Sequence, residues 1–533
     1  MKKLLGLVLI LFLSLKGIAQ AEFNFEIQLQ PINVPNFPGL HSFAFGQHDN
    51  KWILIGGRLD GIHARQPFNA FPANQNNASI FVIDVATAQM WTAPLASLPT
   101  GIREQLQSTN MNFYQDSSTL YIIGGYAFSP TANDHITFPR LTSIDVPGLM
   151  NAVQQNQPIT PYFKQISNSN FANTGGQLGK LGATFYLVGG HRFDGRYNPM
   201  GNPTFTQTYS NQIRKFTIDN SEDQLSFGNY EAITDPIHLR RRDYNLVPQV
   251  FPDGTLGYTI SSGVFQINAD LPFLYPVDIQ PNGYFPQTSF NQYLSNYHSG
   301  KVGLFEAGLN KMHSLFFGGL SQYYYQNGTL IQDNAVPFVR TISRVTRLED
   351  GTLLEFVMPE EMPALHGAGA EFIPNLNLPH YANEVIQLDV ITEDEFVIGH
   401  LVGGIHSNSL NPFSNNNTSS TSASATIYEV KLIRTEPLNV SPVNGTHPFD
   451  FKISPNPTTY RDIHIEFDLP YMVKIDYFIT SIDGKIISEG EIVDVGLGKN
   501  QMRFDLQPIH NQTLLFTFIV DDKFYVTKKI IIK

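Results

Sequence analysis

A pair of adjacent glycines recurs at the end of short apolar runs, and this repeat limits the possible folds more than any other feature of the sequence. The pair closes the runs Ile53-Leu54-Ile55 and Tyr121-Ile122-Ile123 near the start of the chain. The six sites, of which the fourth is a degraded copy, are Gly56-Gly57, Gly124-Gly125, Gly189-Gly190, Ser262-Gly263, Gly318-Gly319 and Gly403-Gly404. A single pair carries little information, but six such sites indicate a repeat architecture.

The surroundings of each copy predict its strands. In most copies an upstream strand leads in through a turn rich in Asp, Asn and Gly, as in "HSFAFGQHDNKW" before the first glycine pair. Downstream come a long polar loop and another strand, such as Ile80–Val85. Four antiparallel strands in each of six copies, with no convincing long helix, predict an all-β fold with a six-bladed β-propeller over residues 22–434. The glycines suit points where a chain turns outward with positive φ or another backbone comes close.

This repeat resembles the kelch family, whose blades carry a Gly-Gly at the end of the second strand. The resemblance covers roughly residues 23–434, although the family's later tryptophan survives only as Trp91. It implies a kelch-like propeller. The alternating stretch Phe23–Gln30 precedes the first copy, whereas the sixth copy reaches only its third strand, at Thr426–Ile433. We therefore expect the N-terminal strand to complete the sixth blade and leave no free edge. The insertion at 374–394 stays unplaced.

The first residues predict export. Lys2 and Lys3 precede the apolar stretch Leu4–Leu15, and Ala19-Gln20-Ala21 forms a small-residue cleavage site, so residues 1–21 are expected to be a signal peptide. No later segment approaches the roughly 20 apolar residues of a transmembrane helix. The chain has no cysteine, which excludes a lipoprotein anchor, disulfides, thiolate metal sites and a cysteine nucleophile. A net charge of −12 without a basic cluster argues against nucleic-acid binding.

The pattern changes after a Pro/Asn/Thr-rich linker at 435–449. Residues 450–533 alternate apolar and polar positions and contain an Asp-Gly hairpin signal, which predicts a small C-terminal β-sandwich domain. Here the chain resembles the type A C-terminal sorting domain of the Bacteroidota type IX secretion system. The matching residues are Pro455, Asn456 and Pro457, then Asp483, Gly484 and Lys485, and finally Lys528 and Lys529 in "KKIIIK".

The resemblance to sorting domains implies a partner and a destination. The partner is the type IX secretion machinery, and the protein is expected to be secreted or held at the outer-membrane cell surface. The family usually has Gly-x-Tyr where Thr513-Leu514-Leu515 stands here, so whether the domain is cleaved after transport stays open.

Long loops follow each glycine pair, at roughly 58–78, 126–139, 191–210, 264–272, 320–335 and 405–423; we call the surface they form the loop face. Loops on a rigid scaffold commonly carry binding sites. Two of these loops share the pattern Arg-x-Asp-Gly, at Asp60 and Asp194. The two aspartates either form structural turns or serve as carboxylates that bind a ligand. Tyr323 and Tyr324 in "QYYYQNG" offer aromatic surface beside amide groups.

The starts of the innermost strands are expected to form a polar ring around a central channel. Arg103, Arg241 and Arg242 stand beside it. By alignment of the copies its members are His41, Glu104, Asn173, Asp243, His298 and His366. The three histidines could be channel-lining or structural, or could contact a substrate. A metal site is the less favoured alternative, and we expect neither a metal nor a cofactor.

Enzyme templates fit poorly. A copper-radical oxidase of the galactose-oxidase type requires a cysteine-crosslinked tyrosine, and this chain has no cysteine. A sialidase would carry repeated Asp-containing turns, and these are absent from the sequence. A sugar mutarotase, isomerase or hydrolase stays open as the alternative, with Glu104 beside Arg103 or Asp243 beside Arg242 as proton-transferring groups.

The sequence favours a secreted or cell-surface protein that binds a protein or a glycan through the loop face, rather than an enzyme. A third reading, a structural subunit of a surface complex, predicts an apolar patch on the outer wall of the propeller. The ligand and the oligomeric state are not determined by the sequence.

Overall fold

The computed structural model describes residues 23–66, 68–199, 204–221, 224–326 and 329–435, followed by 451–459, 462–469, 473–481, 485–492, 495–496, 498–506, 512–520 and 524–533. The expected signal peptide, most of the linker, and Asp483 and Gly484 lie outside these residues. The chain divides into two compact units, Met1–Arg434 and Thr435–Lys533. In the described part of the chain, no helix has the length and apolar character needed to cross a membrane.

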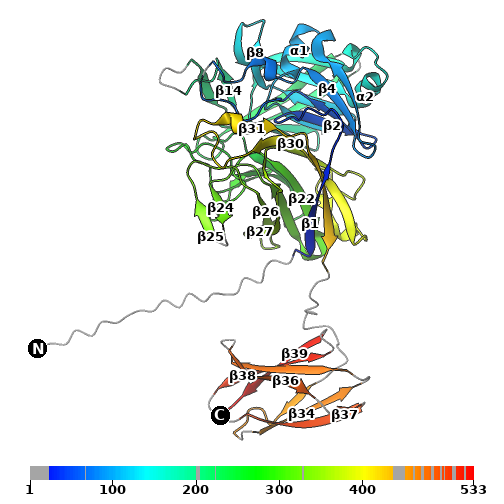
Figure 1. Cartoon of the computed structure of the whole chain (residues 1–533), viewed down its shortest axis with the longest axis vertical. Coiled ribbons are helices and arrows are strands. Elements are labelled where there is room, and N and C mark those ends of the chain that lie inside the picture. Colours follow the sequence, from blue (N-terminus) through cyan, green and yellow to red (C-terminus); the bar gives the residue numbers. More distant parts are fainter. Residues whose placement is uncertain are drawn as a thin grey trace, which may run out of the picture. The chain divides into compact units, whose positions relative to one another are not determined.

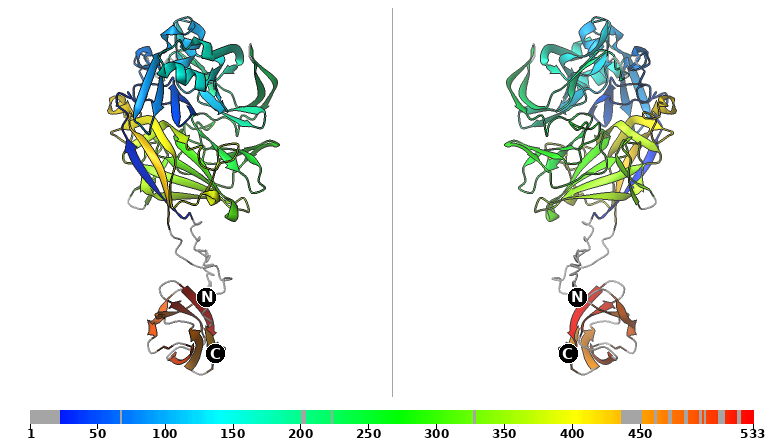
Figure 2. Two further views of the ribbon diagram at one scale, coloured as in Figure 1. Left: turned by 90° about the vertical axis from the view of Figure 1, so that its right-hand side faces the viewer. Right: turned by 90° about the vertical axis from the view of Figure 1, so that its left-hand side faces the viewer.

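The first unit consists mainly of six antiparallel sheets of four strands each (Figures 1 and 2). The first sheet contains β2 (Ala44–His48), β3 (Lys51–Ile55), β4 (Ser79–Asp84) and β5 (Gln89–Pro94). The second contains β6 (Asn112–Asp116), β7 (Thr119–Ile123), β10 (Pro139–Asp145) and β11 (Phe163–Ala172). The third contains β12 (Gln177–Leu181), β13 (Thr184–Val188), β16 (Gln212–Ser221) and β17 (Gln224–Thr234). The fourth contains β18 (Asn245–Val250), β19 (Leu256–Ser261), β20 (Val277–Gln280) and β21 (Gly283–Pro286).

The last two sheets carry additions. The fifth contains β22 (Gly300–Glu306), β23 (Lys311–Phe317), β26 (Thr341–Arg347) and β27 (Leu353–Glu361), with β29 (Ile386–Gln387) parallel to β22. The sixth contains β28 (Leu365–Pro374), β30 (Glu395–Ser407), β32 (Ile427–Arg434) and β1 (Phe25–Ile32), with β31 (Thr421–Ala423) on β30. The expected pairing of the N-terminal strand with the last sheet is confirmed, because β1 pairs with β32 along its whole length. β1 is the edge strand of that sheet.

The glycine pairs connect neighbouring sheets. In each copy the N–H of the second glycine donates to a carbonyl of the segment that enters the next sheet. The six bonds run from Gly57 to Ser108 (2.8 Å), Gly125 to Asn173 (2.9 Å), Gly190 to Arg241 (2.7 Å), Gly263 to Asn296 (3.1 Å), Gly319 to His366 (2.9 Å) and Gly404 to Leu40 (2.7 Å). The last bond returns to the first sheet, so these contacts join all six sheets in a closed circle. The degraded copy takes part through Gly263, after Ser262 with φ of 52°.

A second set of backbone bonds also closes on itself; we call it the inner ring. Each N–H in it donates to the carbonyl of the preceding member, and the sixth bond again joins the last sheet to the first. The donor–acceptor pairs are Asn110–Ser42 (3.1 Å), Gly175–Asn110 (3.1 Å), Asp243–Gly175 (2.7 Å), His298–Asp243 (2.9 Å), Gly369–His298 (2.9 Å) and Ser42–Gly369 (2.7 Å). This arrangement of six sheets is consistent with propeller blades.

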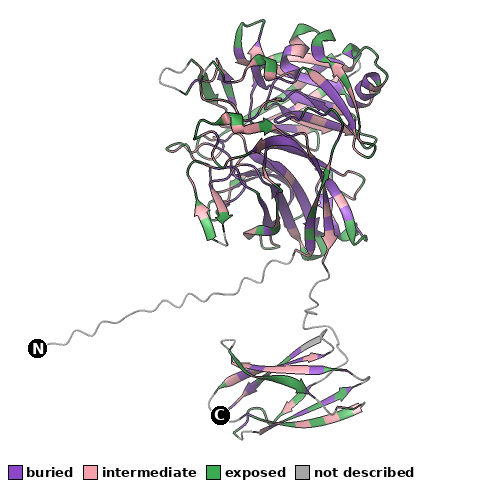
Figure 3. Cartoon of the chain, viewed as in Figure 1, coloured by how far each residue is buried: buried purple, intermediate pink, exposed green. Residues whose placement is uncertain are grey.

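Apolar side chains fill the spaces between neighbouring sheets, which are largely buried in Figure 3. Between the first two sheets, for example, Ile53 and Val82 belong to one core cluster with Leu120 and Ile144. Two short helices, α1 (Thr100–Leu106) and α2 (Val146–Gln154), lie in the connections of this region. The 3-10 turns are η1 (Ala73–Gln75), η2 (Leu95–Ser97), η3 (Thr160–Tyr162), η4 (Ala307–Leu309), η5 (Leu388–Val390) and η6 (Thr418–Ser420).

The loops after the glycine pairs are partly ordered as hairpins. Three of them form two-stranded sheets: β8 (Tyr126–Ser129) with β9 (Asp134–Thr137), β14 (His191–Asp194) with β15 (Thr206–Tyr209), and β24 (Tyr323–Gln326) with β25 (Thr329–Gln332).

The insertion between β28 and β30 crosses the opposite ends of several innermost strands. Asn377 Nδ2 donates to Asn50 Oδ1 of the first sheet's turn (2.7 Å), and Asn383 Nδ2 donates to the carbonyl of Gln249 at the end of β18 (2.9 Å). Ile386 then pairs with Leu304 of β22. We call residues 375–387 the crossing segment.

The second unit contains two sheets around one core that includes Ile463, Phe467, Ile475 and Phe516. One sheet has the order β33 (Lys452–Ser454), β34 (Asp462–Leu469), β37 (Gly498–Asp505), and the other β36 (Ile486–Ile492), β35 (Ile475–Ser481), β38 (Thr513–Val520), β39 (Phe524–Ile531).

Candidate functional site

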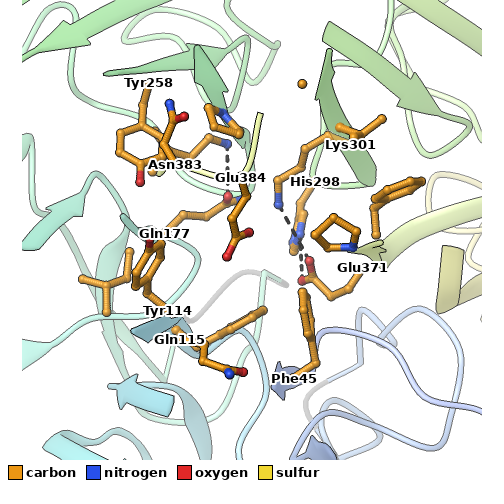
Figure 4. Close-up of a pocket in the computed structure, with 18 of the residues that line it drawn as sticks. Phe45, Tyr114, Gln115, Gln177, Tyr258, His298, Lys301, Glu371, Asn383 and Glu384 are labelled. Carbon is orange, nitrogen blue, oxygen red and sulfur yellow. Dashed lines mark hydrogen bonds and ion pairs between the residues drawn. The ribbon is translucent and has the colours of Figure 1, made fainter. Parts of the chain in front are cut away.

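A cavity of about 420 Å³ lies where the innermost strands of the six sheets meet (Figure 4). The inner ring contributes Ser42, Asn110, Gly175, Asp243 and His298 to its wall, and the crossing segment contributes residues from its middle, among them His380, Asn383 and Glu384. This volume falls in the range of small-molecule sites, about 300–1,000 Å³. We call it the central cavity.

An ion-paired group occupies one side of the central cavity. Glu371 of β28 is buried, at 2% exposure. Its carboxylate lies 3.0 Å from His298 Nε2 and 3.7 Å from Lys301 Nζ of β22. Burial alone would raise the pKa of Glu371, but the two neighbouring bases outweigh it and hold that pKa below its usual range. Glu371 is therefore an ionised carboxylate whose charge is already neutralised.

A second carboxyl group, that of Glu384, stands in a different environment. It comes from the crossing segment, at a residue with φ of 68°, and in Figure 4 its side chain points into the open centre of the cavity. No group in the described residues donates a hydrogen bond to this carboxyl. Burial raises its pKa above the usual range, although His380 and Lys301 act in the opposite direction. The cavity thus holds two carboxyls with opposite pKa shifts.

Aromatic and amide side chains line the side of the cavity across from His298 in Figure 4, with Tyr114, Gln177 and Tyr258 labelled there. The Tyr258 hydroxyl is held by the backbone of Lys180, accepting from its N–H (2.9 Å) and donating to its carbonyl (3.0 Å). Gly179 makes this possible, because a Cβ there would lie 2.6 Å from the tyrosine ring.

Two of the residues predicted for the polar ring, Asp243 and His298, line the cavity and belong to the inner ring. Asp243 is ion-paired with Arg242 next to it. The other two histidines are not among the cavity-lining residues. His41 contacts Ser42 Oγ at 3.1 Å and Asp60 at 3.8 Å, and burial lowers its pKa.

His366 is likewise buried, and burial lowers its pKa to about 4, so that it is neutral at pH 7. Among the described residues, no group of three or more His, Asp or Glu side chains is arranged to hold a metal ion. The fully buried Arg241 serves the fold, donating to the carbonyls of Ser262 and Tyr275 at 2.6 Å each.

The placement of Glu104 and Arg103 at the start of an innermost strand was wrong. Both lie on α1, and the corresponding member of the inner ring is Asn110. Glu104 accepts hydrogen bonds from Ser129 Oγ (2.7 Å) and Thr131 Oγ1 (2.6 Å), which fix the β8–β9 hairpin. Burial alone would raise its pKa, but these bonds lower it. The short helix inserted before β6 displaced the alignment.

Asn173 also lies just outside the inner ring, whose member in that sheet is Gly175. It is fully buried; its Oδ1 accepts from Arg214 (2.8 Å) and its Nδ2 donates to Asn112 (3.1 Å). Asn173 therefore has a structural role.

The two loop aspartates are also engaged in structural bonds. Asp60 accepts from Arg58 Nε (2.8 Å) and Nη2 (2.5 Å), and Arg58 is itself 1% exposed. Asp194 accepts from Arg192 Nε (2.5 Å) and from the backbone N–H of Thr137 in the neighbouring loop (3.1 Å). Both carboxylates keep about a quarter of their surface exposed, at 26% each.

Aromatic contacts join several loops of the loop face. His63 stacks on Phe71 at 4.6 Å and meets Tyr197 at 4.7 Å and Phe413 at 5.3 Å, edge to face. These rings come from the loops of the first, third and sixth sheets, and Arg65 lies over Phe413 at 5.6 Å. Tyr323 packs against Tyr293 at 4.8 Å, and its neighbour Tyr324 is half-buried.

In the second unit, two of the three predicted sorting motifs meet. Asn456 Nδ2 donates to the carbonyl of Lys529 (2.6 Å), and its Oδ1 accepts from the N–H of Ile531 (3.0 Å). Pro455 and Pro457 flank Asn456, and all three are exposed. The carbonyl of Lys485 accepts from the N–H of Ser481 (3.0 Å) in the β35–β36 hairpin, and Lys528 lies on β39.

Reasoning from the sequence missed the main cavity groups Glu371, Glu384, Lys301, Tyr114 and Tyr258. Lys301 and Glu371 were accessible in principle, since inward-facing positions alternate along an innermost strand once its start is known. The unusually long connection between β28 and β30 was the available sign of the crossing segment.

No protein-family model matches the chain, and no curated protein matches it in sequence. Among solved structures, YjhT is similar with a TM-score of 0.40 and 11% identity, over 75% of this chain and 98% of that chain. A fungal alcohol oxidase of the AA5 family, in complex with copper, has a TM-score of 0.36 and 9% identity, over 96% and 100%. PorZ, a surface component of the type IX secretion system of Porphyromonas gingivalis, has a TM-score of 0.22 and 7% identity, over 92% and 59%. All three TM-scores lie below 0.5 and say nothing of this chain's function.

Proposed function

We propose that the chain is an exported binding protein, secreted or held at the cell surface, whose first unit is a six-bladed kelch-like β-propeller. The two closed circles of backbone hydrogen bonds support the propeller, because each passes once through every sheet and returns to the first. In this proposal the ligand is a macromolecule, and it is recognised by the loop face.

The observation that carries this proposal is the clustering of loop aromatics and arginines described above. His63 contacts rings from the loops of the first, third and sixth sheets, so these three loops pack against one another. Aromatic residues and arginine are enriched at the centres of protein interfaces. A rigid surface of this composition suits recognition.

Exposed apolar side chains on the same loops favour a protein over a glycan as the partner. Phe68 is 71% exposed, Ile267 56%, Tyr325 45% and Leu410 42%. Such side chains gain by burial against another apolar surface. A glycan partner, which aromatic rings could also contact, is the other outcome of the test.

The test measures binding of the full chain to intact envelope fractions. We expect Phe68→Ala with Leu410→Ala to weaken binding at least tenfold, and the matched pair Ile237→Ala with Phe285→Ala, exposed apolar residues outside the loop face, to leave it unchanged. Protease treatment of the envelope should abolish binding to a protein partner, whereas periodate oxidation should abolish binding to a glycan. Equal loss in both double variants would contradict a role of the loop face.

For the second unit we propose a β-sandwich sorting domain that directs the chain to the type IX secretion machinery. Its support is the contact between Asn456 and the terminal strand, which places the first and last sorting motifs together. A chain ending at Arg434 should stay inside a type IX-competent cell, whereas the full chain should reach the medium or the cell surface. Equal export of the two would refute this role.

A sugar mutarotase, isomerase or hydrolase acting in the channel is the second candidate. One observation favours it: Asp243, paired with Arg242, lines the central cavity. Glu104 does not, since its carboxylate is occupied on α1. Turnover of a sugar by the full chain that is lost in Asp243→Asn but kept in Glu104→Gln would establish this candidate.

A further inference from the structure

The residues that line the central cavity all lie outside the loops that form the loop face. The inner ring contributes to one end of its wall, and the crossing segment spans the opposite ends of the innermost strands through Asn377, Asn383 and Ile386. Gly303 leaves room for that segment, because a Cβ there would lie 3.3 Å from Val385 and 2.8 Å from the carbonyl of Pro248. The crossing segment therefore packs closely on β22.

The charges of the central cavity are largely neutralised within it. Glu371 is paired with His298 and Lys301, and Asp243 is paired with Arg242. A cationic ligand would find the carboxylates of Glu371 and Asp243 already paired, and an anionic ligand would find Lys301 already engaged by Glu371. His380 contacts the carbonyl of Leu378 through Nδ1 (2.8 Å). Glu384, the carboxyl without a partner, lies where burial favours its neutral form. The cavity is thus suited to an uncharged molecule.

Two neighbouring groups of the crossing segment lack hydrogen-bond donors. Asn383 is 3% exposed; its Nδ2 donates to the carbonyls of Gln249 and Gly257, but its buried Oδ1 has no partner among the described residues. The Glu384 carboxyl next to it has none either. The buried Asn383 Oδ1 is costly to leave without a donor, about 1–3 kcal/mol, and the half-buried Glu384 carboxyl beside it is open to the cavity. Together they point to a ligand or water that supplies O–H groups.

Apolar surface in the same cavity comes from Phe45, Phe113, Phe372 and the rings of Tyr114 and Tyr258. A molecule that carries several hydroxyls and also apolar C–H faces would satisfy both kinds of wall. We propose that the central cavity binds a small neutral polyhydroxylated molecule of about monosaccharide size, whose hydroxyls donate to Glu384 and Asn383 while a C–H face lies on the aromatic wall.

The test is saturation-transfer NMR and calorimetry on the full chain with D-glucose, D-galactose, D-mannose, N-acetylglucosamine and myo-inositol. Glucosamine and glucuronate serve as cationic and anionic probes. We expect at least one neutral probe to bind. Glu384→Ala should weaken its affinity at least tenfold, whereas Glu384→Gln, which keeps two hydrogen-bonding atoms, should stay within threefold. The matched control Glu393→Ala removes an exposed carboxylate outside the cavity and should change nothing.

The outcomes are distinct from those of the loop-face test, because Glu384→Ala should leave envelope binding intact. Absence of binding by every neutral probe would overturn the proposal. So would preferential binding of glucosamine or glucuronate, or equal affinity of wild type and Glu384→Ala. If Glu384→Ala lowers the melting temperature, two other measurements test the proposal: the affinity of Glu384→Gln, and hydrogen exchange in residues 375–387. The neutral probe should slow this exchange, and unchanged exchange would count against the proposal.

Discussion

The ring of Phe25 lies 4.9 Å from the guanidinium carbon of Arg434, and the two residues are also partners in the antiparallel pair of β1 and β32. The first and last strands of the first unit are thereby held together at the outer edge of the sixth sheet. The N-terminal strand contributes Phe25 and Ile27 to the core between the fifth and sixth sheets.

Truncation of Ile27 should therefore destabilise the first unit. Ile27 is 3% exposed and faces that core, so Ile27→Ala is expected to cost about 2–5 kcal/mol of unfolding free energy. Glu26→Ala, at the exposed neighbouring position, should change it by less than about 0.5 kcal/mol. Urea denaturation, monitored by tryptophan fluorescence, gives the unfolding free energy of each variant. Similar effects of the two substitutions would show that the closing strand adds little.

A glycine at a close inter-sheet contact should tolerate no side chain. A Cβ on Gly124, which has φ of 69°, would lie 1.8 Å from the carbonyl oxygen of Asn173. Gly182 has a similar φ of 59°, but nothing lies within 4 Å of its Cβ position. We expect Gly182→Ala to cost about 1–2 kcal/mol from backbone strain alone and Gly124→Ala to cost more than about 3 kcal/mol. Thermal unfolding compares them, and equal costs would mean that the close approach is unimportant.

Protonation of the largely buried His400 should be detectable through the fluorescence of a neighbouring tryptophan. His400 packs on Trp52 at 4.9 Å, and burial lowers its pKa to about 4 even though Glu429 lies 3.7 Å away. The folded state holds this pKa below the unfolded value of 6.5. Keeping His400 neutral therefore contributes about 3 kcal/mol to the unfolding free energy above pH 6.5. This contribution is lost as the pH falls from 6.5 through 4.

Trp52 fluorescence, measured in a Trp91→Phe background, should therefore fall near pH 4 as the imidazolium forms and quenches it. His400→Gln should remove this step. A midpoint near 6.5 would show that the imidazole is solvated.

The contact between sorting motifs gives a fourth prediction. Asn456→Ala removes both hydrogen bonds to β39 and should lower the stability of the second unit by about 1 kcal/mol. Hydrogen exchange at Ile531 should accelerate, since its N–H loses its acceptor. Glu491→Ala, at an exposed position of β36, is the control and should leave exchange unchanged. Unchanged exchange in Asn456→Ala would mean that the contact is not maintained in solution.

The sequence predicted the repeat of four-stranded antiparallel sheets, because each copy shows the local periodicity of its strands. It also predicted the pairing of the first strand with the last, because the sixth copy has only three strands of its own. The glycine positions were also predictable, since each requires positive φ and close approach. The residues that line the central cavity were harder to predict. Glu104 was misplaced because α1 inserts residues before β6, and Glu384 was missed because its role depends on a segment whose path over three sheets has no local signature.

The pairing of β1 with β32 has a topological consequence. Because the polypeptide enters and leaves the first unit on adjacent strands, its two ends could be spliced and new ends opened at a short turn such as His48–Lys51 without removing any strand from its neighbours. Such a circular permutant would keep every sheet intact. The fold therefore does not require the chain ends of the first unit to lie at β1 and β32.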